Sequence, residues 1–186
     1  MLTTVHIFFG TKGDNDARRV EEIGAVAKFI KDRAKKEGEN NILLGDFNIV
    51  KTTHATMNAL LNQGFYIPEA IREHPTDLKK TSHYDQIAFK LKMDSSMTVF
   101  SEGDQHAGAF NFTETVYRQE DLATYRGYFN EETINRLIEK NTKYAPEKVI
   151  EDYYLGTWRT FQMSDHLPLW IELKVDFSDQ YLKKIL

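Results

Sequence analysis

Residues 41–48 read NILLGDFN, and this stretch decides the fold because it joins a short apolar run to a polar loop. The run 41–44 is typical of a buried strand, and residues 2–9 (LTTVHIFF) predict another strand that ends at Gly10. Between them, residues 16–37 predict one long helix, with apolar side chains at alternating spacings of three and four: Val20, Ile23, Ala27, Ile30 and Ala34. A strand, a long helix and a second strand form a crossover that usually makes parallel neighbours. We therefore predict an α/β layer.

Downstream, the patterns predict helices at 53–63 and 131–140 and strands at 83–92, 98–101 and 167–177. Pro146 is placed to open a further helix, and residues 179–186 read as a short amphipathic tail. Residues 110–155 are rich in aromatic side chains and read as a large excursion between strands. We expect these aromatic residues to pack within the excursion, with a substrate cleft as the alternative reading.

Composition indicates one ordinary soluble domain: 186 residues, 41% hydrophobic and 28% charged. The 24 Lys and Arg against 28 Asp and Glu give a net charge of −4, which does not indicate general nucleic-acid binding. The absence of Cys excludes disulfides, thiolate zinc sites and cysteine nucleophiles, and it fits the cytoplasm. No apolar run approaches the roughly 20 residues of a membrane span, and residues 2–9 are too short for a signal peptide.

Polar residues stand at the predicted strand ends in three places: GDFN at 45–48, HYDQI at 83–87 and SDH at 164–166. Taken singly, GDFN reads as a capped turn and HYDQI as the polar face of a strand. Asp and His at the start of an apolar strand more often serve a site. Together with His6, the three stretches predict a ligand site at neighbouring strand ends.

These motifs, in this order, resemble those of the endonuclease/exonuclease/phosphatase superfamily, whose members include pancreatic deoxyribonuclease and inositol-polyphosphate 5-phosphatases. The resemblance implies a deoxyribonuclease-I-like fold, a four-layer αββα sandwich. It also implies a hydrolase, a phosphoesterase that uses Mg²⁺ or Mn²⁺ and cleaves phosphodiester bonds in the manner of a nuclease.

The resemblance also assigns roles to particular residues. Asp165 and Asp46 are the expected metal ligands, and Asp46 also orients or deprotonates the attacking water. Asn48 is expected to bond a phosphate oxygen, and Asp85 to orient the ring of His166, which faces the phosphate. His6 is expected to contact the phosphate or the leaving group, with an ordinary core histidine as the alternative. We expect the remaining histidines to be exposed: His54, His74, His83 and His106.

Members of the superfamily also have an upstream half, which supplies an Asn on the first strand and a metal-binding Glu. This sequence has a counterpart to neither, so we expect residues 1–186 to be one domain that is incomplete at its N-terminal side and shows little or no turnover by itself. One alternative function is an impaired remnant that serves as a binding or interaction module, and another is a plain α/β domain with accidental motifs. The expected partners are a phosphoester substrate, with nucleic acid among the choices, and either a second copy of the chain or the missing half.

Overall fold

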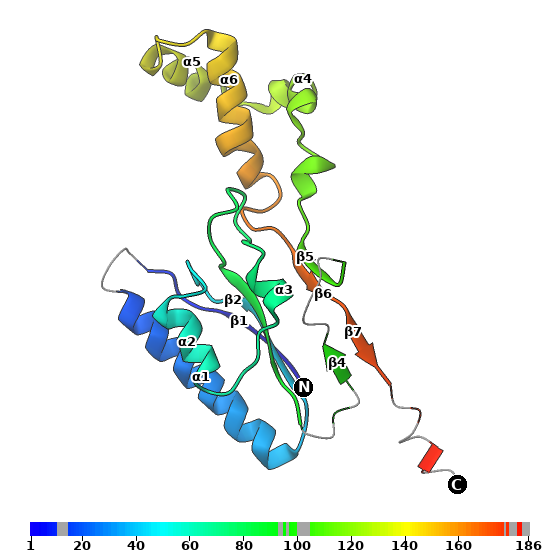
Figure 1. The fold of residues 1–186 in the computed structure, drawn as a ribbon. Coiled ribbons are helices and arrows are strands. Elements are labelled where there is room, and N and C mark those ends of the chain that lie inside the picture. The colour runs from blue at the N-terminus through cyan, green and yellow to red at the C-terminus, as the bar shows by residue number, and fades with distance from the viewer. Residues whose placement is uncertain are drawn as a thin grey trace. The chain divides into compact units, whose positions relative to one another are not determined.

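The computed structural model describes residues 1–10, 15–92, 95, 97–99, 105–176, 178 and 182–183. These residues form a mixed α/β protein that divides into two compact units (Figure 1). The first unit comprises Met1–Phe110 and Pro168–Leu186, and the second comprises Asn111–Leu167. The predicted excursion therefore becomes a unit of its own and extends beyond residue 155 to Leu167.

A three-stranded sheet forms the centre of the first unit. Its strands are β1 (Leu2–His6), β2 (Asn41–Asp46) and β3 (Asp85–Lys90), in the order β1-β2-β3. β1 runs parallel to β2, as the crossover predicts, and β3 runs antiparallel to β2. The parallel pair brings the ends of β1 and β2 to the same edge, where β3 begins.

Helix α1 (Asn15–Glu37) is the crossover between β1 and β2. Its predicted face is confirmed: Ile23, Ala27, Ile30 and Ala34 are buried, and the first three join one core with Leu43 of β2. The helix ends at Gly38, whose φ of 65° suits glycine and whose N–H donates to the carbonyl of Ala34 at 2.9 Å.

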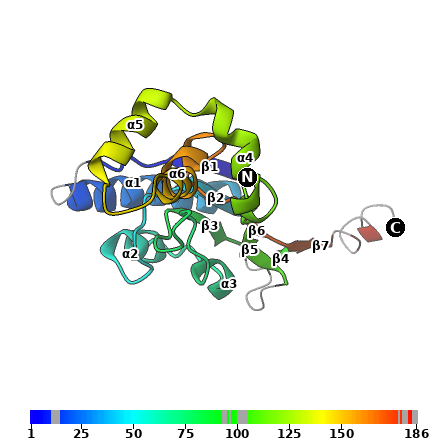
Figure 2. The same cartoon turned by 90° about the horizontal axis from the view of Figure 1, so that it is seen from above.

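The remaining elements of the first unit extend this core. They are helices α2 (Ala55–Leu61) and α3 (Glu69–Arg72) and strands β4 (Met97–Val99), β5 (Ala107–Ala109), β6 (Leu169–Ile171) and β7 (Leu173–Val175). α2 contacts α1, whereas α3 contacts β5 and β6 and lies beside them in both views (Figures 1 and 2). Ala107 of β5 belongs to the same buried cluster as Leu43.

The prediction of a single strand at 167–177 is wrong in one respect, because this stretch forms two short strands with different partners. β6 pairs with β5, and β7 pairs with β4, both antiparallel. Between them, the N–H of Glu172 donates to the carbonyl of His106 at 2.7 Å, where the chain leaves one partner for the next. The predicted tail at 179–186 lies largely outside the described residues, as does the end of the strand predicted at 98–101.

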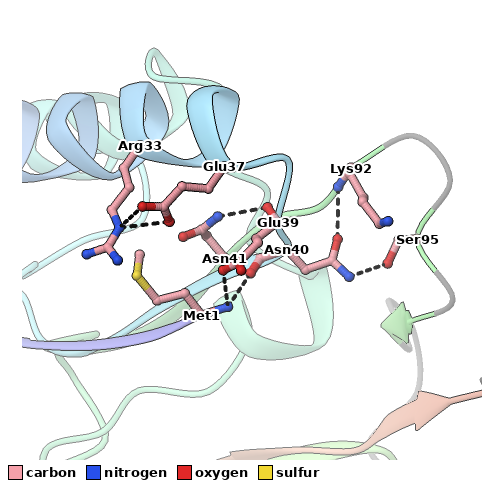
Figure 3. A network of polar contacts seen from close by, with 8 residues as sticks. All are labelled: Met1, Arg33, Glu37, Glu39, Asn40, Asn41, Lys92 and Ser95. Atoms are coloured by element: carbon pink, nitrogen blue, oxygen red, sulfur yellow. Dashed lines mark hydrogen bonds and ion pairs between the residues drawn. The ribbon is translucent and has the colours of Figure 1, made fainter.

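A polar network fixes the end of the central sheet that lies away from the predicted site (Figure 3). The N-terminal amino group of Met1 donates to the carbonyl of Asn40 at 2.5 Å. The Asn40 side chain accepts from the N–H of Lys92 at 2.9 Å and donates to Ser95 Oγ at 2.7 Å. One asparagine after α1 therefore ties the start of β1 to the chain that follows β3.

The second unit is helical. It contains α4 (Leu122–Tyr125), α5 (Glu131–Lys140), α6 (Pro146–Tyr153), a π-helical turn (Tyr154–Trp158) and 3-10 turns at Phe112–Glu114, Gln119–Asp121, Arg126–Tyr128 and Arg159–Phe161. Asn130 caps α5 by accepting from the N–H of Thr133 at 2.8 Å, and Pro146 opens α6 as predicted. The core contains Phe129, Ile134 and Tyr154, with further aromatic rings packed on it. Most of the predicted aromatic residues therefore pack the unit, whereas Phe110 and Tyr128 are exposed.

Within the described part of the chain, no helix has the length and apolar character needed to cross a membrane.

Candidate functional site

Three of the predicted site residues form one row across the central sheet. His6 ends β1, Asp46 ends β2 and Asp85 begins β3. In the strand register, His6 is the partner of Asp46, and Asp46 is the partner of Asp85. Register partners project from the same face of a sheet, so an imidazole and two carboxylates lie side by side there.

Asp46 lies at the centre of this row, and both of its carboxylate oxygens are engaged. Oδ1 accepts the N–H of Asn48 at 2.8 Å, and Oδ2 lies 3.5 Å from Nε2 of His6. The Asp46 side chain is 19% exposed, whereas that of His6 is 80% exposed. His6 is therefore a surface histidine beside a carboxylate, and the core-histidine alternative is wrong.

Asp85 contributes the second carboxylate. Asp46 and Asp85 each present an oxygen within 4.8 Å of the other. Two like charges this close repel each other unless a cation or a proton offsets them. The backbone N–H of Asp85 donates to Oγ1 of Thr76 at 3.1 Å, and Thr76 is fully buried.

The loop before β3 is held by another carboxylate, that of Asp77. Its side chain accepts the N–H groups of Thr81 and Ser82, both at 2.6 Å. Burial alone would raise the pKa of Asp77, but these hydrogen bonds outweigh it and lower the pKa below its usual value. The ionised Asp77 thus fixes the turn that delivers Asp85 to the edge of the sheet.

Asn48 is buried beneath the row rather than presented on it. Its backbone is left-handed, with φ 53°, and its side-chain nitrogen donates to the carbonyl of Ile7 at 2.5 Å. The carbonyl of Asn48 accepts from Nη1 of Arg19 at 3.2 Å. In this structure the Asn48 amide holds two strands together, and its predicted bond to a phosphate oxygen stays a prediction.

The SDH stretch belongs to the second unit. Asp165 is exposed, and His166 is half-buried, with its N–H donating to Ser164 Oγ at 3.0 Å. His166 lies three residues before Leu169, the first residue of β6. The predicted Asp85–His166 dyad and the metal-binding role of Asp165 both stay predictions.

The four histidines expected to be exposed, His54, His74, His83 and His106, are all partly buried instead. His74 Nε2 and His83 Nδ1 are both buried without a hydrogen-bond partner. Burial lowers the pKa of His83, and the nearby Asp77 carboxylate offsets part of that shift. His106 pairs with Glu172, with 2.9 Å between Nδ1 and Oε2.

The donors of the row suit a hard divalent cation. Magnesium prefers oxygen ligands and is usually held by one or two carboxylates together with water and substrate phosphate. Asp46 and Asp85 offer such carboxylates, both from the central sheet of the first unit. The residue types therefore fit Mg²⁺ or Mn²⁺.

Sequence reasoning missed several residues that support this site. It assigned Asp85 only to the orientation of His166, whereas its carboxylate also faces Asp46. It gave no role to Thr76 or Arg19, which hold Asp85 and Asn48 through backbone groups. A buried threonine or arginine carries no motif, and its contact to a distant backbone atom becomes visible only in the folded chain.

Comparison with known proteins adds no family to this geometry. A scan against protein-family models gives no match, and a search of curated proteins gives no match either. The functional assignment therefore rests on the residues of this chain.

Proposed function

We propose that this chain is a metal-dependent phosphoesterase of the endonuclease/exonuclease/phosphatase type, and that it hydrolyses phosphodiester bonds with Mg²⁺ or Mn²⁺. The observation that carries the proposal is the row of His6, Asp46 and Asp85 across three adjacent strands. In this proposal the central sheet is part of a deoxyribonuclease-I-like αββα sandwich.

Asp46 and Asp85 would hold the cation, which would neutralise charge on the nonbridging phosphate oxygens. Asp46 would also orient a water molecule, and this role is supported by the Asn48 N–H that holds Oδ1 and by the His6 ring near Oδ2. Hydrolysis forms a bond from the water oxygen to phosphorus and breaks the bond to the leaving oxygen, which takes up a proton. The exposed His6 is placed to donate a hydrogen bond to the phosphate or to that oxygen. His166, oriented by Asp85, would face the phosphate as the motif resemblance implies.

Exposed aromatic rings beside the row favour a nucleic-acid substrate over a lipid or a small phosphoester. Phe8 and Phe9 lie two and three residues after His6 and are 54% and 39% exposed, while the intervening Ile7 is buried. The ring of Phe9 meets the edge of Tyr84, which precedes Asp85, at 6.1 Å between centroids. Aromatic rings next to a phosphate site can stack on bases, which suits single-stranded nucleic acid.

The experiment is a pair of measurements on the same protein. We expect Mg²⁺ or Mn²⁺ to raise the melting temperature and to permit slow cleavage of a labelled single-stranded oligonucleotide. Asp46→Asn should abolish both effects, whereas Asp32→Asn, which removes an exposed carboxylate on α1, should change neither. Phe8→Ala should weaken oligonucleotide cleavage but leave hydrolysis of bis(p-nitrophenyl) phosphate intact.

Two results would count against the proposal in different ways. If neither metal changes the melting temperature and no substrate is cleaved, the phosphoesterase assignment is wrong. If the metal binds and an oligonucleotide binds with it but is not cleaved, the chain is the binding module that was the alternative from the sequence.

A further inference from the structure

Arg19 is a buried cation in the first turns of α1, close to the carboxylate row. It is only 6% exposed, and a charged side chain is rarely buried unless its charge is paired. Its Nη2 pairs with the carboxylate of Asp16, and its guanidinium lies over the ring of Phe9, 4.8 Å from the centroid. Its Nη1 donates to the carbonyl of Asn48 at 3.2 Å.

Asn48 has a left-handed backbone, with φ 53°. This conformation costs most non-glycine residues about 1–2 kcal/mol and asparagine less, because its short polar side chain can hydrogen-bond locally. Three hydrogen bonds hold it there: from Arg19 to its carbonyl, from its side chain to Ile7, and from its N–H to Asp46 Oδ1. The same backbone conformation therefore aims one group at Arg19 and another at the carboxylate.

The consequence for Asp46 is a fixed carboxylate orientation. With Oδ1 held by the Asn48 N–H, Oδ2 is directed toward His6. If the Asn48 backbone relaxed toward an ordinary negative φ, its N–H would turn away and Oδ1 of Asp46 would lose this hydrogen bond. A residue that restrains Asn48 thus restrains Asp46 indirectly, through the Asn48 N–H.

We infer that Arg19 is a positioning residue for the Asp46 carboxylate, acting through the left-handed backbone of Asn48. The metal-binding consequence rests on the proposed function, whereas the effect on Asn48 does not. A simpler role is that Arg19 only fastens the start of α1 to β2. The two roles differ in what is lost when the guanidinium is removed.

The test uses Arg19→Met, Arg19→Lys and the neighbouring control Arg18→Met. Arg18 is exposed, its guanidinium lies 4.9 Å from the Phe8 ring centroid, and it resembles Arg19 in size and charge. Hydrogen exchange of the Asn48 amide reports the positioning directly, and Mn²⁺ affinity reports its consequence. Loss of a residue that orients a metal ligand typically costs about 10- to 100-fold in metal affinity.

In Arg19→Met we expect the Asn48 amide to exchange at least about tenfold faster than in the wild type, relative to the amides of Leu43 and Leu44, with Mn²⁺ affinity reduced about tenfold. Arg19→Lys should restore part of both, since its ammonium can still donate to the Asn48 carbonyl, and Arg18→Met should change neither. If Asn48 exchange rises only in step with Leu43 and Leu44, Arg19 is merely structural and the inference is wrong.

The test also decides the role of Arg19 in two less favourable cases. If Arg19→Met does not fold, Asp16→Asn loosens the same guanidinium and must show the same selective exchange at Asn48; otherwise the inference fails. If the wild type binds no Mn²⁺, the proposed function fails, and the exchange comparison at Asn48 still decides the role of Arg19.

Discussion

Asp46 and Asp85 face each other directly across the antiparallel β2–β3 pair, and each places a carboxylate oxygen within 4.8 Å of the other. A like-charge pair at this position opposes folding unless something offsets it. The His6 imidazole, 3.5 Å from Asp46 Oδ2, is one neighbour that can offset the pair, and in the proposed function a bound cation is the other.

Asp85→Asn tests this explanation by separating stability from metal response. Without metal, removing one of the two like charges should change the free energy of unfolding by less than about 1 kcal/mol. With Mg²⁺ present, the wild type should gain stability and the variant should gain little. Denaturant unfolding with and without Mg²⁺ measures both, and an equal Mg²⁺ response in the two proteins would contradict a role for Asp85 in binding.

Gly45→Ala should unfold the central sheet. Gly45 has φ 133°, and a Cβ there would lie 2.1 Å from the carbonyl oxygen of Val5, its partner on β1. Because the Val5 carbonyl belongs to paired backbone that cannot move aside, we expect the free energy of unfolding to fall by about 3 kcal/mol or more.

Gly24→Ala is the matched control. Gly24 lies in α1, and a Cβ there would meet nothing within 4 Å. Since alanine favours a helix over glycine by about 1 kcal/mol, this variant should be more stable than the wild type. Thermal melts of the two variants should shift in opposite directions.

Thr76→Val should loosen Asp85 while preserving the shape of the buried side chain. Thr76 Oγ1 accepts the Asp85 N–H at 3.1 Å, and valine leaves that donor unpaired. An unpaired buried donor costs about 1–3 kcal/mol, so unfolding should become easier by that amount. Thr76→Ser retains the hydroxyl and should keep the Asp85 amide protected from exchange. Equal protection in the valine and serine variants would show that Thr76 does not hold Asp85.

We expect the buried Tyr154 to make the protein less stable at alkaline pH. Its ring is fully buried and its hydroxyl donates to the carbonyl of Arg118 at 2.9 Å. Burial raises the pKa of Tyr154 to about 12 from 10.0. The neutral phenol is thus favoured in the folded state. Its contribution to the free energy of unfolding is complete below pH 10 and is lost as the pH rises toward 12. Ultraviolet titration should find one tyrosine that ionises last, and Tyr154→Phe should remove it; Tyr128→Phe, at an exposed ring, should not.

The outer edge of β1 predicts self-association. The carbonyl of Met1 and the N–H of Ile7 bond to β2, so alternation directs the backbone groups of Leu2, Thr4 and His6 toward the other edge. β1 has no Lys, Asp, Glu or Pro to discourage a further strand, and Leu2 is 62% exposed. Light scattering over a dilution series should detect dimers that Thr4→Lys removes. A monomer at every concentration would contradict this prediction.

Local sequence patterns were sufficient to predict the elements that each bury one face. Ile23, Ala27 and Ile30 define the buried side of α1 by their spacing alone, and the crossover rule then makes β1 and β2 parallel. The break at Glu172 was not predictable, because residues 167–177 form a continuous apolar alternation and the change of partner depends on where β4 and β5 lie.

The site was predictable as a set of residues but not as an arrangement. Motifs indicated Asp46, Asp85 and His6, whereas the direct opposition of the two carboxylates depends on the register of β3. That register is supported by the loop in which Thr76 holds the Asp85 backbone and Asp77 caps the turn, and both contacts come from ordinary polar residues that no motif marks.

The pairing of β5 with β6 also bears on how this protein could change over evolution. Ala109 is the register partner of Leu169, and the N–H of Phe110 donates to the carbonyl of Pro168 at 2.8 Å. The two ends of Asn111–Leu167 therefore leave the first unit from adjacent points of one hairpin, as an insertion does. Such a segment can be lengthened or shortened without altering the register of either strand. Changes of length before residue 164 would also leave the SDH stretch at 164–166 attached directly ahead of β6.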